Sequence, residues 1–262
     1  MDFLTGIVNI FEQGPVFVLV LFRIGGLLTS APMFSSVSIP VNIKIFIALI
    51  LAMIIFPVVP TVTWAPDSYL VLAIAIGSEM LIGIAMGFVI SLIMLGVQLG
   101  AEIMSQQMGL SMSQLIDPSS NAQTTVISQF FLLLVTVIFL ISNGHLVLIQ
   151  ALRNTFDVVP LMAGFHSQAV VDTMIATITT AFQLGICIAG PGLVAIFLAT
   201  LALGFISRTM PQLNILAAGF PIRIGLSFVI LLVTLTAVVG LFDNYMTLAL
   251  QSIGNMFLTD RV

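Results

Sequence analysis

The sequence predicts an all-α membrane protein with about six major apolar helices, some of them kinked or broken. Three observations predict this class. Of its 262 residues, 60% are hydrophobic and only 6% are charged, whereas soluble domains have about 25% charged residues. Several apolar runs exceed the roughly 20 residues that a spanning helix needs. The alternating pattern of a membrane β-barrel is absent, so we expect the spans to be helical.

Composition and motifs exclude several functional classes. A net charge of −4 with six basic residues does not predict a nucleic-acid partner. The single cysteine, Cys187, has no second cysteine with which to form a disulfide in the chain. Neither an H-E-x-x-H motif, a G-x-S-x-G motif nor a phosphate-binding glycine loop is present. We therefore expect no metal, no cofactor and no enzymatic activity.

The first third of the chain predicts a short interfacial helix and two apolar helices. Residues 2–13 place apolar side chains on one face and polar ones on the other, as interfacial helices do. Gly14-Pro15 precedes the first apolar helix, expected over about 15–33, and the second runs over 41–59. Arg23 lies within the first, where a charge is costly in lipid. Structural pairing with an acid is the favoured interpretation, and contact with cargo is the alternative.

The longest predicted helix is Tyr69–Gln107, and its apolar part alone measures roughly 43 Å, more than the thickness of a hydrocarbon core. It contains two pairs of small residues, Gly83 with Gly87 and Gly96 with Gly100. The second pair follows the first by about two and a half turns, so the pairs are expected to face opposite ways. Glycine allows close helix contact, which indicates a helix wedged between neighbours.

Charged residues inside these apolar runs are expected to be buried and structural. Glu79 lies in the middle of the long helix and needs a partner such as Arg23. Glu102 lies near the end of the same helix. Which partner each charge finds is left open by the sequence.

The second half predicts three further apolar stretches. One helix is expected from Val126 to about Ile149, followed by a connecting loop over 154–168. The stretch 169–207 is interrupted by Gly-Pro-Gly at 190–192, which fits either one kinked helix or two short ones. The last apolar helix is expected over Ile224–Phe242, followed by an amphipathic tail.

A polar interval, residues 98–125 (QLGAEIMSQQMGLSMSQLIDPSSNAQTT), separates the third and fourth apolar helices. Met104, Met108 and Met112 recur every four residues, which would place them on one helix face. The interval contains Glu102 and an aspartate but neither lysine nor arginine, although cytoplasmic loops of membrane proteins are usually basic. Both a segment enclosed by protein and a solvated connecting loop fit this composition.

Three motifs in order resemble the FliR family: FRIGGLLTSAPMFSSVSIPVNIKIFIAL, QMGLSMSQLIDPSS and PQLNILAAGFPIRIG. The resemblance covers nearly the whole chain. FliR proteins belong to the export gate of flagellar and virulence-associated type III secretion systems. The resemblance implies a single gate domain over 1–262, in which about 1–207 resemble a FliP-type subunit and about 208–262 a FliQ-type subunit. It also implies a place in the bacterial inner membrane, at the flagellar basal body.

The resemblance implies partners as well. One FliR-type chain joins about five FliP-type and about four FliQ-type copies in a helical, pore-forming assembly. A FlhB-type switch protein would wrap the outside, and unfolded export substrates would cross through the pore. Much of the assembled gate would be lifted out of the plane of the bilayer.

In this family, the middle loop projects into the channel as a plug, beside a methionine-rich gasket from the FliP-type subunits. By motif, the corresponding plug segment here is residues 108–122. Flexible apolar side chains can close a narrow pore and repack around cargo. Many relatives would carry aromatic residues at two positions where this chain has Met112 and Leu115. The candidate sealing residues are Met108, Gly109, Leu110, Ser111, Met112, Leu115, Ile116, Asp117 and Pro118.

A secondary transporter of a small solute is the alternative from another functional class. Apolar helices interrupted by Gly and Pro, together with charges inside the membrane, are typical of transporters too. Against it, the two halves of the chain show no matched pair of broken helices, and the apolar runs contain few charges for ion coupling. An intramembrane enzyme is a third and weaker hypothesis. A transporter should be stable without partners, whereas a gate subunit should require them.

Overall fold

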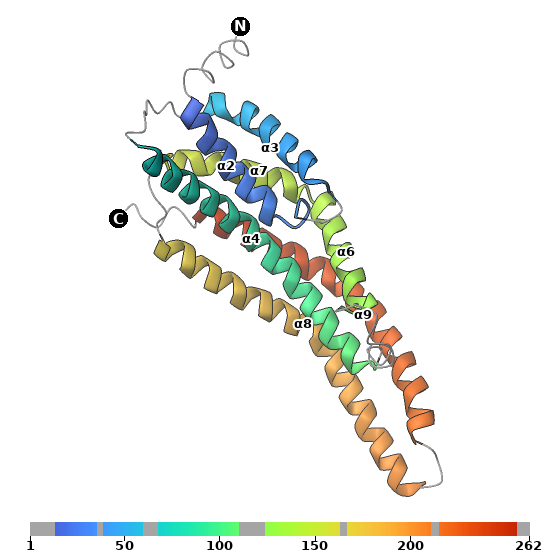
Figure 1. Ribbon diagram of the computed structural model, residues 1–262. Coiled ribbons are helices and arrows are strands. Elements are labelled where there is room, and N and C mark those ends of the chain that lie inside the picture. The colour runs from blue at the N-terminus through green and yellow to red at the C-terminus, as the bar shows by residue number, and fades with distance from the viewer. Residues whose placement is uncertain are drawn as a thin grey trace. The chain divides into compact units, whose positions relative to one another are not determined.

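The computed structural model describes residues 14–35, 39–59, 68–109, 124–162, 167–210 and 215–255. Every regular element in these ranges is a helix, as Figure 1 shows, so the expected all-α class is confirmed. The interfacial helix predicted over 2–13 lies outside the described residues. In chain order the helices are α2 (Gly14–Ser30), α3 (Val41–Ile55), the 3₁₀-helix η1 (Phe56–Val58), α4 (Tyr69–Gln107), α6 (Val126–Ile141), α7 (Gly144–Val158), α8 (Ser167–Thr209) and α9 (Ile215–Asn255).

Helix α4 begins and ends at the residues that the sequence predicts. The hydroxyl of Ser68, just before the helix, accepts a hydrogen bond from the N–H of Leu70 at 3.1 Å, in the manner of an N-terminal cap. No proline interrupts the following 39 residues. An uninterrupted apolar stretch with a capping residue before it is therefore sufficient to locate this helix.

The prediction of a single helix over 126–149 is wrong, because the chain forms two helices there. Asn143, between α6 and α7, has φ 56°, a left-handed backbone conformation that ends one helix and allows the next to leave in a new direction. Helix α7 then extends to Val158, into the range where a loop was predicted. Its buried Leu148, Leu152 and Phe156 recur every four residues, so the helix buries one apolar face.

Prolines lie inside both of the last two helices. Of the two possibilities for 169–207, the structure shows one helix, α8, with Pro191 inside it. Helix α9 begins earlier and ends later than the predicted 224–242, with Pro221 inside it. A proline removes one main-chain hydrogen bond and bends a helix, but packing against neighbouring helices can keep the helix continuous past the proline.

The chain packs as two compact units. Unit 1 comprises residues 1–92, 143–177 and 246–262, and unit 2 comprises residues 93–142 and 178–245. Helices α4, α8 and α9 each contribute one part to unit 1 and another to unit 2. The division into a FliP-like and a FliQ-like part near residue 207 remains a prediction.

The core of unit 1 is formed where α2 packs on its neighbours. Leu19, Val20 and Ile24 of α2 are completely buried. The rings of Phe17 on α2 and Phe56 on η1 meet edge to face, with centroids 5.6 Å apart. Such a pair adds about 0.5–1.5 kcal/mol beyond its buried area, which helps to hold α3 and η1 against α2.

The core of unit 2 contains the second part of α4 and the buried faces of α6, α8 and α9. Its largest buried side chains are aromatic, with Phe131 and Phe139 on α6 and Phe242 on α9, all at most 2% exposed. Leu184 of α8 and Val97 of α4 are fully buried in the same unit. Large apolar side chains thus supply the main stabilisation of this unit.

Four helices of the described residues are long and apolar enough to cross a membrane, and the number is five if α6 and α7 together count as one broken span. This is fewer than the six predicted, because α2 has only 17 residues and α6, which ends at Ile141, has only 16. In the most apolar window of α4, 61% of residues are buried, against 22% in the corresponding windows of α3, α8 and α9. Most residues in these three windows are therefore at least partly exposed.

Candidate functional site

An ion pair is buried in unit 1, between α2 and α4. The Nε of Arg23 donates a hydrogen bond to Oε2 of Glu79 at 2.5 Å. The side chain of Arg23 is 0% exposed and that of Glu79 is 1% exposed. The two residues are 56 positions apart in the chain. Removal of either partner would leave an uncompensated charge in an apolar core, which is costly.

The remaining guanidinium nitrogens of Arg23 bind the end of α7. Nη1 and Nη2 each donate to the carbonyl oxygen of Val159 at 3.2 Å, and Nη1 also donates to Oγ1 of Thr155 at 3.3 Å. The guanidinium carbon lies 4.4 Å from the ring centroid of Phe156. Val159 is the C-cap of α7, where the helix dipole favours a cation. Arg23 therefore also caps α7.

The second carboxylate oxygen of Glu79 binds the chain just beyond α7. The N–H of Met162 donates to Oε1 of Glu79 at 3.1 Å. Met162 has φ 71°, a left-handed conformation that costs a non-glycine residue about 1–3 kcal/mol unless its surroundings hold it. Each member of the ion pair thus binds a different backbone group: Arg23 holds a carbonyl and Glu79 holds an N–H. Neither Thr155, Val159 nor Met162 carried a signal in the sequence that marks it as a partner.

The first glycine pair of α4 lies against α2. A Cβ on Gly83 would overlap the carbonyl oxygen of Arg23, and one on Gly87 would overlap Oγ of Ser30. From the other side, a Cβ on Gly26 of α2 would overlap the carbonyl oxygen of Met80. The two backbones touch because these positions lack side chains. Glu79 lies one turn before Gly83, so this close approach brings its carboxylate to Arg23.

The second glycine pair of α4 lies against α8, within unit 2. A Cβ on Gly96 would lie 2.5 Å from the carbonyl oxygen of Ala181, and one on Gly100 would lie 2.5 Å from that of Gly185. Both distances are shorter than van der Waals contact. The two pairs of α4 therefore serve two different neighbours, one in each unit.

The end of α4 is closely packed against α8 in unit 2. Met104 is 0% and Met108 1% exposed, and a Cβ on Gly192 would lie 2.8 Å from both Cγ and Sδ of Met104. The helix ends at Gln107, and Gly109 follows with φ 80°, which favours glycine. Of the predicted sealing residues, only Met108 and Gly109 are described. Those that lie outside the described residues are Leu110, Ser111, Met112, Leu115, Ile116, Asp117 and Pro118.

Glu102 binds the start of α6. Its Oε2 accepts a hydrogen bond from the N–H of Thr125 at 3.0 Å and another from the Thr125 hydroxyl at 2.8 Å. Gln106 donates a weaker one to Oε1 at 3.4 Å. Glu102 is only partly buried, where the sequence predicts a buried charge; the residues beside it on α4 that are fully buried are Ala101, Met104 and Ser105. Thr125 was not among the predicted site residues, although a Thr before an apolar run is a recognisable N-cap signal.

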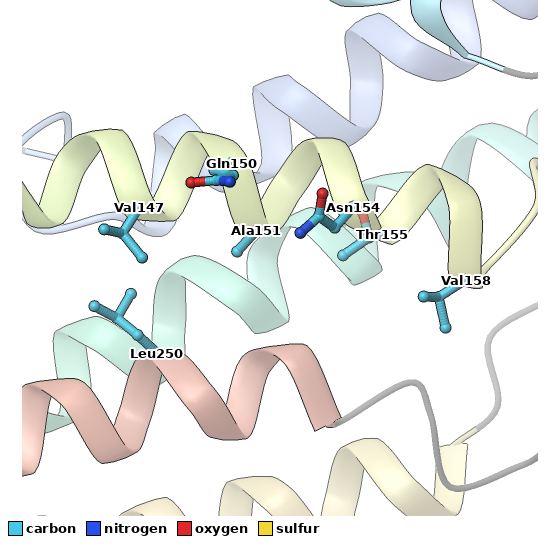
Figure 2. Close-up of a pocket in the computed structure, with 7 residues that line it drawn as sticks. All are labelled: Val147, Gln150, Ala151, Asn154, Thr155, Val158 and Leu250. Atoms are coloured by element: carbon cyan, nitrogen blue, oxygen red, sulfur yellow. The ribbon is translucent and has the colours of Figure 1, made fainter.

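A small groove lies beside the Arg23 site in unit 1. It is lined by one face of α7 and by Leu250 of α9, and Figure 2 shows Val147 and Leu250 facing each other across it. Thr155, which binds Arg23, also lines it. None of the lining side chains is titratable in the physiological range, so the groove offers no acid, base or thiol nucleophile. Among the described residues, no three His, Cys, Asp or Glu side chains gather closely enough to hold a metal ion.

The chain is similar to known proteins over most of its length. Residues 15–249 match the family described as bacterial export proteins, family 1. The flagellar biosynthetic protein FliR of Bacillus subtilis (strain 168) is 28% identical over 257 residues, covering 95% of this chain and 96% of the relative. The FliR protein of Escherichia coli (strain K12) is 32% identical over 219 residues, covering 83% and 84%. That of Caulobacter vibrioides (strain ATCC 19089 / CIP 103742 / CB 15) is 28% identical over 232 residues, covering 88% and 92%.

Proposed function

Because the chain belongs to the bacterial export proteins, family 1, we propose that it is a membrane subunit of the flagellar protein-export apparatus. The observation that carries this conclusion is the match to relatives named flagellar biosynthetic protein FliR, which covers nearly all of both chains. The long apolar helices agree with it, since four helices within the described residues reach the length of a membrane span. The comparisons lend no support to the secondary transporter.

The finer proposal is a non-enzymatic gate subunit in the bacterial inner membrane. Its partners are FliP-type and FliQ-type subunits and a FlhB-type switch protein, and unfolded substrates cross through the shared pore. Support comes from the uncovered apolar surface of α3, α8 and α9, whose most apolar windows are only 22% buried. Surface of this kind requires lipid or neighbouring apolar subunits to cover it.

Within this gate, the plug segment (residues 108–122) restricts the resting pore, and Met112 and Leu115 exclude water. The support is its polar but nearly uncharged sequence, which contains no basic residue and several flexible apolar side chains. Met104 and Met108, at the end of α4, are buried in the packing of unit 2, so the segment leaves from a well-packed helix end. An apolar constriction gates by dewetting, which requires no fixed charge and no catalytic group.

The experiment is co-expression of the chain with FliP-type and FliQ-type subunits, followed by a leak measurement. The wild-type chain should co-elute with both partners as one large complex and should aggregate or be degraded when expressed alone. Deletion of residues 110–116, or Met112→Asp, should leave the complex intact and raise the ion conductance of membranes that contain it. A charge or a void in an apolar constriction admits water and then ions.

Two results would contradict the proposal separately. A monodisperse homodimer that binds a small solute would refute the gate-subunit hypothesis and favour the secondary-transporter hypothesis. A deletion variant that assembles and stays as tight as wild type would show that the segment is only a connection between α4 and α6. As a matched control, Ser119→Ala should change neither assembly nor conductance, because it adds no charge and removes only one hydroxyl.

A further inference from the structure

The start of α6 is capped by residues from two different parts of unit 2. Thr125 is its N-cap, and Oγ1 of Thr125 accepts a hydrogen bond from the N–H of Ser128 at 3.4 Å. In the common capping box, an acid or amide three residues after the N-cap accepts the N–H of the N-cap residue itself. Here that position holds Ser128, whose hydroxyl turns back to the carbonyl oxygen of Thr125 at 2.9 Å. The N–H of Thr125 instead donates to Glu102 on α4.

Glu102 thus supplies, from another helix, the acid that a capping box normally supplies locally. It accepts two hydrogen bonds from Thr125, one from the main chain and one from the side chain. Its negative charge also lies at the amino end of α6, where the helix dipole favours an anion. A local acid would satisfy the helix start alone. The acid from α4 also joins the start of α6 to the end of α4.

The part of α4 that contains Glu102 is closely packed. Gly100 touches the backbone of α8, and Met104 packs on Gly192, so the turns on either side of Glu102 cannot easily shift. Ser105 is fully buried in the same turn. Within unit 2, Glu102 therefore joins Thr125 to a well-packed part of α4.

We propose that Glu102 is a positioning residue that caps α6 from α4 and holds together the two ends of the connection between these helices. The inference rests on the proposed function, in which part of that connection restricts the pore. Without Glu102, the start of α6, where that connection ends, would no longer be held to α4 by these two hydrogen bonds. Loss of the contact should therefore loosen the seal without removing any sealing residue.

The test uses the co-purified complex, reconstituted in vesicles of phosphatidylethanolamine and phosphatidylglycerol. Two quantities are measured: hydrogen exchange of the peptide that contains Thr125–Gln129, and leak of potassium chloride. Glu102→Ala should speed exchange at the start of α6 about tenfold, equivalent to about 1.4 kcal/mol, and should raise the leak above wild type. The exchange rate and leak of Glu102→Gln should lie between those of wild type and Glu102→Ala, because an amide oxygen still accepts a hydrogen bond but carries no charge.

Controls separate this inference from the proposed function. Gln107→Ala changes an exposed side chain at the end of α4 and should match wild type in both measurements. The variant that lacks residues 110–116 serves as the reference for the leak expected when most of the proposed seal is removed. If the deletion leaks but Glu102→Ala speeds exchange without leaking, the positioning role is refuted and the proposed function stands. If the deletion itself does not leak, the proposed function fails. Unchanged exchange in Glu102→Ala would refute the cap.

A second pair of variants covers the case in which Glu102→Ala does not assemble. Thr125→Ser keeps the hydroxyl that donates to Glu102, whereas Thr125→Val removes it at nearly constant volume. The valine variant should leak and the serine variant should not. Equal leak from the two would overturn the proposal.

Discussion

The Arg23–Glu79 pair is predicted to tolerate no exchange of its two charges. In a pair held only by mutual attraction, the double variant Arg23→Glu/Glu79→Arg would restore what each single variant loses. Here each member also binds a backbone group of fixed polarity, a carbonyl of Val159 and the N–H of Met162. The exchange would place a carboxylate at the carbonyl end of α7 and a guanidinium at an N–H.

The expected loss follows from the contacts. Each single variant leaves one charge buried without its partner, which costs about 3–5 kcal/mol. The exchanged pair keeps the ionic attraction but loses its charge-assisted hydrogen bonds to two backbone groups, at about 1.5–3 kcal/mol for each group. We therefore expect the double variant to lose about 3–6 kcal/mol, as much as a single variant.

The assay is the yield and heat resistance of the complex after co-purification with FliP-type and FliQ-type subunits. All three charge variants should lower both quantities by similar amounts. Thr155→Val removes the hydroxyl contact to Nη1 and the hydrogen bond of that hydroxyl to the carbonyl oxygen of Leu152, but it leaves both charges paired, so it should cost less and serves as a control. A double variant with the yield and heat resistance of wild type would refute the capping role of the pair. Normal assembly of Arg23→Leu with lost export would instead indicate contact with cargo.

Two further predictions concern the glycines of α4. Gly83→Ala should lower the yield of the complex, because the added Cβ meets the backbone of α2 and such overpacking costs about 1–3 kcal/mol, whereas Gly77→Ala, with nothing within 4 Å, should be neutral or stabilising. The thermal stability of the co-purified complex is measured for both variants. If Gly83→Ala and Gly77→Ala change it equally, then α2 does not approach α4 closely at Gly83. In unit 2, Gly96→Ala should be destabilising by a similar amount because it meets a carbonyl on α8, while Gly204→Ala, in open space, provides the control. Heat resistance of Gly96→Ala equal to that of the control would contradict this contact.

Much of the fold could be predicted from the sequence, because composition and periodicity act locally. The bounds of α4 were predicted correctly, since an apolar run without proline between a capping serine and a glycine has few alternatives. The break at Asn143 was not predicted, although Asn143-Gly144 is a turn signal in the sequence. The left-handed conformation of Asn143, which ends one helix before the next begins, is seen only in the structure.

The candidate site divides in the same way. From the sequence alone, Arg23 and Glu79 are recognisable as costly charges in apolar helices that need partners. Which partners they find depends on residues 56 and more positions away, brought together by glycine contacts between α2 and α4. The burial of Glu102 was overestimated, because the sequence shows a charge within a long helix but not which side of that helix its neighbours cover. Hydrophobicity is local and can be read along the chain, whereas hydrogen-bond partners depend on distances that only the tertiary structure determines.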